Sequence, residues 1–125
     1  MILKPLAVVA MLALLGTAVR AAELAPIARA EIDHLLDTLG RSGCEFYRNG
    51  TWYGAAEARS HLETKLGYLV KKNLVSTADE FVDLAATKSS MSGEPYQVRC
   101  APAAPVPSRD WLRAELARFR ARPAR

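Results

Sequence analysis

Cys44 and Cys100 are the only cysteines in this chain of 125 residues, so only one intramolecular disulfide is possible. A bond between them would close a long loop, and loop-closure entropy predicts a stabilisation of about 4 kcal/mol. The alternative roles are a redox centre or a metal thiolate site, but both favour a C-x-x-C spacing that this pair lacks. We therefore expect a structural disulfide if the chain folds in an oxidising compartment.

The N-terminal residues predict such a compartment. Lys4 precedes an apolar run over residues 6–15, Gly16 interrupts it, and residues 19–21 suit cleavage after Ala21. The run is shorter than the roughly 20 residues of a membrane-spanning helix, and neither cysteine lies near the cleavage point to carry a lipid. We expect a cleavable signal peptide over residues 1–21 and a soluble exported protein.

Charge and size restrict the partners of the remaining chain. Without its first 21 residues the chain has length for one domain, and its formal charge of +4 falls by the two charges of Lys4 and Arg20. Positive charge gathers from residue 109 onward, where six arginines lie. Outside the inner membrane the anionic partners are lipid headgroups and polysaccharide, so we expect no nucleic acid and at most peripheral contact with an anionic membrane surface.

Apolar residues at helical spacing predict helices over residues 26–39, with Gly40 just past the end, and over residues 55–70. Thr77 and Glu80 are a capping box that opens a third helix. The residues expected to be buried in the last two of these helices are Ala55, Ala58, Leu62, Leu66 and Leu69, then Phe81, Leu84 and Ala85. Ser108 is expected to cap a final helix that buries Trp111, Leu112, Leu116 and Phe119.

Two short strands are expected, over residues 43–48 and 96–100, each with one cysteine on its core-facing side. Asn49-Gly50 is a turn signal, after which residues 51–53 either pair briefly or lead into the next helix. The predicted fold is α+β and mainly α, with about four helices packed on a small two- or three-stranded antiparallel sheet. Residues 22–100 are the compact body, 101–107 a stiff extended connector, and 108–125 a helix and basic tail of the same domain.

Three blocks carry a family resemblance: CEFYRNG at 44–50, EARSHLETKL at 57–66 and SSMSGEPY at 89–96. Their order and spacing resemble the YfeK-like family of small exported proteins of Gram-negative bacteria, a domain of unknown function. The likeness covers nearly the whole chain after residue 21, including Trp111-Leu112. It implies a periplasmic location and one compact domain, and it implies no catalytic residue.

Glu57, His61 and Lys65 follow at i, i+4 and i+8, so they form one column at the edge of a helix's apolar stripe. There a carboxylate could orient the imidazole as a general base requires, or the column could be a polar margin of the core. The two histidines, His34 and His61, lie on different helices and are too few for a metal site, so we expect no metal and no cofactor.

The loop over residues 89–93 is rich in hydroxyl groups, which could cradle an anion, supply a nucleophile or satisfy the loop's own backbone. Arg48 could pair with Glu57 or reach an anionic ligand. The candidate binding surface comprises Arg48, Asn49, Glu57, His61, Lys65, Ser89, Ser90, Ser92, Gly93 and Tyr96.

Our leading hypothesis is a non-enzymatic periplasmic binding module for a protein or envelope ligand. One alternative is an envelope hydrolase, with His61 as base within about 3.2 Å of a serine of the 89–92 segment. Another, within the binding class, is a periplasmic inhibitor or immunity protein. Ser92, Gly93 and Tyr96 also match the S-G-x-x-Y motif of one class of periplasmic lysozyme inhibitors, but those are all-β proteins and this chain is helical.

Overall fold

The computed structural model describes residues 2–5, 7, 10, 16 and 23–123. Most of the predicted signal peptide, its expected cleavage point and the last two residues of the basic tail lie outside the described residues. No helix in the described part of the chain combines the length and the apolar character needed to cross a bilayer.

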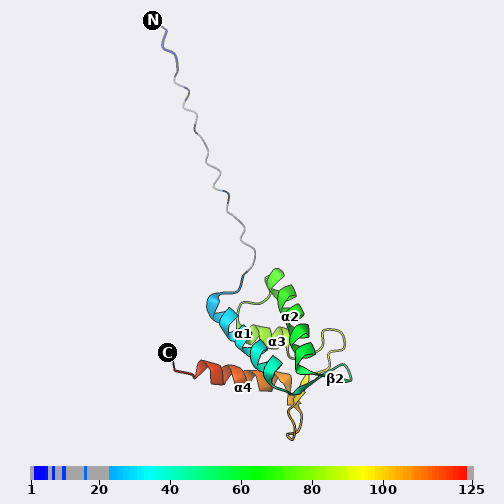
Figure 1. Ribbon diagram of the computed structural model, residues 1–125. Helices are drawn as coiled ribbons and strands as arrows, with labels where there is room; N and C mark the ends of the chain where they lie inside the picture. The colour runs from blue at the N-terminus through cyan, green and yellow to red at the C-terminus, as the bar shows by residue number, and fades with distance from the viewer. Residues whose placement is uncertain (1, 6, 8–9, 11–15, 17–22, 124–125) are drawn as a thin grey trace.

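Four helices gather together, and a small sheet lies at one end of them (Figure 1). In chain order the elements are α1 (Pro26–Arg41), β1 (Glu45–Arg48), β2 (Thr51–Tyr53), α2 (Ala55–Lys71), α3 (Ala78–Ala85), β3 (Gln97–Arg99), β4 (Val106–Pro107) and α4 (Ser108–Arg120). The strands are antiparallel neighbours in the order β2-β1-β3-β4. The α+β class is confirmed, and the sheet has one strand more than expected.

The disulfide joins the two strands at the centre of the sheet. Cys44 precedes β1, Cys100 follows β3, and their Cα atoms lie 4.5 Å apart. The register places Phe46 opposite Val98, both buried, so the cysteines extend the core-facing row. The predicted disulfide between neighbouring strands, with two helices in the crossover, is confirmed.

The segment 101–107 differs from the extended connector that its prolines suggested. Its chain turns back, with Ala103 N–H donating to the Cys100 carbonyl at 2.9 Å, and β4 then pairs with β3. Pro107 is tolerated because β4 is an edge strand, where a missing N–H costs no ladder bond. The segment therefore makes a turn, and its last two residues, Val106 and Pro107, belong to the sheet.

Helical spacing predicted most of the core correctly. The apolar residues at helical spacing in α1 are buried, and so are the leucines predicted for α2, whereas Ala55 and Ala58 are only partly buried. Those of α1 are Ala28, Ile32, Leu35, Leu36 and Leu39. Leu84 was predicted wrongly: it is 49% exposed, and Val82, fully buried, takes its place. Together with Phe81 and Ala85, Val82 continues a stripe that starts at Ala78, one turn earlier than we assumed.

Two helix ends also differ from expectation. α1 continues through Gly40 to Arg41, and the turn falls at Gly43 with φ +67°. The missing Cβ of Gly40 leaves room for the side chain of Arg59. Ser108 does not cap α4: within the described ranges its side chain makes no capping bond. It is the first helical residue, and its N–H donates to the Tyr96 carbonyl at 2.9 Å.

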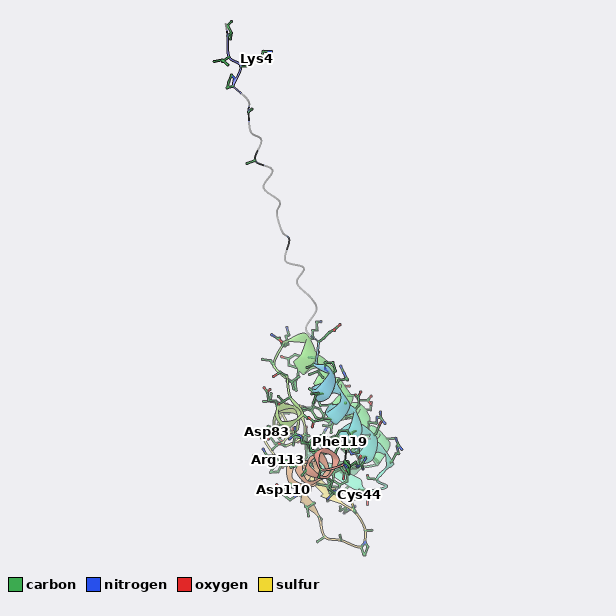
Figure 2. The ribbon with its side chains drawn as sticks, turned by 90° about the vertical axis from the view of Figure 1, so that its left-hand side faces the viewer. Lys4, Cys44, Asp83, Asp110, Arg113 and Phe119 are labelled. Atoms are coloured by element: carbon green, nitrogen blue, oxygen red, sulfur yellow. A yellow bond between two sulfur atoms is a disulfide. The ribbon has the colours of Figure 1, made fainter. Side chains whose placement is uncertain are left out.

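Ion pairs hold α4 on the body of the domain. Arg120 pairs with Glu31 and Asp79, and Arg113 pairs with Asp83 at 2.7 Å (Figure 2). Arg109 and Arg118 are paired as well, so four of the five described arginines from residue 109 onward have acidic partners inside the fold. The membrane contact expected for this segment stays a prediction.

Candidate functional site

Arg48, His61, Lys65 and Tyr96 meet where the sheet contacts α2, and we call them the donor cluster. Arg48 ends β1, His61 and Lys65 lie one turn apart on α2, and Tyr96 directly precedes β3. Arg48 Nη1 lies 2.7 Å from His61 Nδ1, and His61 Nε2 lies 3.2 Å from the Tyr96 hydroxyl. Lys65 Nζ approaches the same hydroxyl at 3.2 Å.

Hydrogen-bond accounting shows that this cluster has more donors than acceptors. A guanidinium can only donate, so His61 Nδ1 must accept from Arg48, and the ring proton is on Nε2. The Tyr96 oxygen then accepts from both His61 and Lys65. The hydroxyl proton of Tyr96 is left without an acceptor among the described residues, and four of the five side-chain N–H groups of Arg48 donate to no side chain there.

Charge in the cluster is positive and unbalanced. Within the described ranges neither Arg48 nor Lys65 forms an ion pair with a carboxylate, although most other arginines do. Burial first, and then the charges of Arg48 and Lys65, lower the pKa of His61, which favours the neutral ring. Burial and Arg48 also lower the pKa of Lys65, and burial raises that of Tyr96. A bound anion would offset the repulsion between the positive charges of Arg48 and Lys65.

A cavity of about 120 Å³ opens beside the cluster. Arg48, His61 and Tyr96 belong to its wall, and Glu57 lies on it as well. The apolar part of its lining consists mainly of Leu39, Phe46, Ala58, Leu62, Ala86 and Leu112. The site thus combines an apolar space with a set of hydrogen-bond donors at one side.

The loop before Tyr96 is fastened to the β1–β2 hairpin. Ser92 Oγ donates to Asn49 Oδ1, and the Tyr47 hydroxyl donates to Glu94 at 3.2 Å. Asn49 and Gly50 both have positive φ, as the predicted Asn-Gly turn requires. Ser89 Oγ accepts the N–H groups of Met91 and Ser92, so this hydroxyl organises its own loop.

The predicted surface is therefore brought together in two parts, the donor cluster and the Asn49–Ser92 contact. Glu57 was one candidate to orient the imidazole, the alternative being a polar margin of the core, but Arg48 occupies Nδ1 of His61. The Glu57 side chain makes no hydrogen bond among the described residues. Ser90 is exposed, and Gly93 has φ +74° and donates its N–H to the Ser89 carbonyl at 3.0 Å. Both ring nitrogens of His61 have other partners, so the serine–histidine pair that a hydrolase would need is not formed among the described residues.

Sequence reasoning missed Tyr47, Glu94 and Lys88. The carbonyl of Lys88 accepts from Lys65 Nζ at 3.3 Å and helps to hold this amine at the cluster. No local pattern indicated these contacts, because they depend on how the loop folds back onto β1. Among the described residues no group of three or more His, Cys, Asp or Glu side chains could hold a metal ion.

Comparison of the sequence with known proteins identifies relatives of this chain. The model of a family of unknown function (DUF5329) matches residues 26–120. The chain belongs to this family. It is also similar to the uncharacterised protein YfeK of Salmonella typhimurium (strain LT2), with 40% identity over 68 residues, which are 54% of this chain and 55% of YfeK. The chain thus spans about half the length of this curated relative, and the resemblance to the YfeK-like family is confirmed. No solved structure matches the chain.

Proposed function

We propose that this member of the DUF5329 family is exported to the periplasm and acts as a binding protein that takes an anionic group at the donor cluster. The observation that carries the proposal is the surplus of donors: Arg48, Lys65 and the Tyr96 hydroxyl converge, and no described carboxylate accepts from them. A bound anion would supply the missing acceptor and charge.

Export is supported by the N-terminal sequence and by the disulfide, which persists in oxidising compartments. Fractionation of a Gram-negative host that expresses the chain tests this part. We expect a periplasmic product that a thiol-alkylating reagent labels only after reduction. A cytosolic product with both thiols open to alkylation would contradict the proposed location.

Acetate, the simplest carboxylate probe, tests the binding part. We expect acetate to shift the NMR signals of the His61 ring with an affinity in the millimolar range, about 4 kcal/mol of binding free energy. R48Q and K65Q should each weaken this response at least about tenfold, because each removes a charged donor. K72Q is the matched control, since Lys72 is an exposed residue just past the end of α2. An acetate response that is absent, or equal in all three variants, would refute the anion site.

A further inference from the structure

We infer that the ligand is a carboxylate on a carbon that also bears a compact apolar side chain, as in a free apolar amino acid or the C-terminal residue of a peptide. The carboxylate binds the donor cluster, and the side chain enters the adjoining cavity. This inference rests on the proposed anion site and adds the class of ligand.

Shared residues link the two halves of the site. Arg48, His61 and Tyr96 hydrogen-bond within the cluster and also line the cavity. A group bound to the guanidinium and the tyrosine hydroxyl therefore lies at the cavity wall. The apolar part of the ligand therefore has to begin within a few bonds of its charged group. Ligands in which a long spacer separates the charge from the apolar part are excluded.

The size of the cavity limits the apolar part. An engineered apolar cavity of about 150 Å³ holds one benzene ring, so the 120 Å³ here suits a branched aliphatic group or a small ring. A long acyl chain would exceed it. Phe46, Leu62 and Leu112 are buried on its wall and would surround such a group with apolar atoms.

The donors favour a carboxylate over a dianion. The two oxygens of a carboxylate carry four lone pairs. These can accept from the guanidinium of Arg48, from Lys65 Nζ and from the hydroxyl proton of Tyr96. Only two fixed positive charges are present in the cluster, and Glu57 on the cavity wall would repel a further negative charge. The Glu57 carboxylate instead suits the ammonium group of a free amino acid, which a peptide C-terminus lacks at that position.

The test compares N-acetyl-L-leucine with N-acetylglycine and N-acetyl-L-leucinamide, using the His61 ring signals and calorimetry. We expect the leucine derivative to bind at least about tenfold more tightly than the glycine derivative, because only its side chain fills the cavity. The amide should bind at least about tenfold more weakly than the acid, because it lacks the charge.

Two pairs of variants separate the halves of the site. A58L places a larger side chain on the cavity wall and should remove the preference for leucine over glycine, whereas A56L, on the exposed side of the same helix, should keep it. Y96F removes the hydroxyl whose proton lacks an acceptor in the cluster, and it should weaken binding of the acid at least about fivefold. Y68F alters an exposed tyrosine of α2 outside the cavity lining and should not.

Equal binding of the leucine and glycine derivatives by the unmodified protein would overturn this inference, while the acetate response would still support the anion site. Failure of all carboxylates, acetate included, would instead refute the proposed function itself. Comparison of L-leucine with N-acetyl-L-leucine identifies the source. Tighter binding of the free amino acid that E57Q abolishes supports an amino-acid ligand, and tighter binding of the acetylated form supports a peptide C-terminus.

Discussion

At the scale of single residues, His61 is the most informative group, because its neighbours determine its protonation. Arg48 donates to Nδ1 and thereby assigns the proton of the neutral ring to Nε2, which faces Tyr96. Protonation of Nδ1 would bring its N–H against the N–H of Arg48, with no acceptor between these two donors. The ring is therefore a reporter of charge in the cluster.

R48A should raise the pKa of His61 while leaving it below the ordinary value of 6.5. The guanidinium is one cause of the lowered pKa, but burial is the larger cause and persists in the variant. An NMR titration of the His61 ring measures this. K72A provides the control for loss of one distant charge, and a His61 pKa that falls in R48A would contradict the assigned contact.

His61 should also make stability depend on pH. Its folded-state pKa is lowered below the unfolded value near 6.5, so the unfolded chain takes up this proton first as the pH falls. The stability contribution is full above about pH 6.5 and is lost as the pH drops through the folded-state pKa. Urea unfolding from about pH 7 to pH 5 should show a flatter profile for H61Q than for the parent. Parallel profiles would mean that His61 titrates alike in both states.

At the scale of secondary-structure elements, α2 carries both the site and a weak point. Gly67 is an exposed interior residue of this helix, and a Cβ there would meet nothing within 4 Å. G67A should raise the free energy of unfolding by about 0.5–1 kcal/mol, because alanine loses less backbone entropy. G50A is the contrast: Gly50 has φ +85°, so alanine there should destabilise by about 1 kcal/mol or more. Urea unfolding of both variants checks the opposite signs.

The start of α3 depends on its predicted cap. Thr77 Oγ1 accepts the N–H of Glu80 at 3.1 Å. T77A should lower the free energy of unfolding by about 1 kcal/mol. T64A serves as the control, since Thr64 lies on an exposed turn of α2, where alanine is the better helix former. Thermal unfolding that affects both variants equally would show that the cap contributes nothing.

Local pattern predicted what depends on local geometry. Spacing along α1 and α2 identified the buried leucines, and the i, i+4 relation correctly placed His61 and Lys65 on one face of α2. The sequence offered Glu57 as one possible partner of His61, because Glu57 lies one turn away on the same helix, whereas the actual partner, Arg48, arrives from β1 through the hairpin. Tyr96 reaches the cluster through pairing of β1 with β3, which helical spacing cannot encode.

At the scale of the whole molecule, the disulfide ties together contacts that are distant in sequence. It closes a loop of 56 residues that contains α2 and α3 and fixes β1 beside β3. Reduction, or the double variant C44S/C100S, should lower the free energy of unfolding by about 4 kcal/mol in the loop-entropy estimate. The double variant should then no longer respond to reductant in urea unfolding. A parent protein that is equally stable with and without reductant would contradict a structural role.

The same bond has a consequence for proteolysis. The loop around Met91, whose side chain is 92% exposed, lies between the two cysteines. A protease that cuts there would produce two polypeptides that still migrate as one species until they are reduced. Arg48 and Tyr96 would then belong to different fragments of a single covalent particle, so a nicked molecule keeps both halves of the donor cluster.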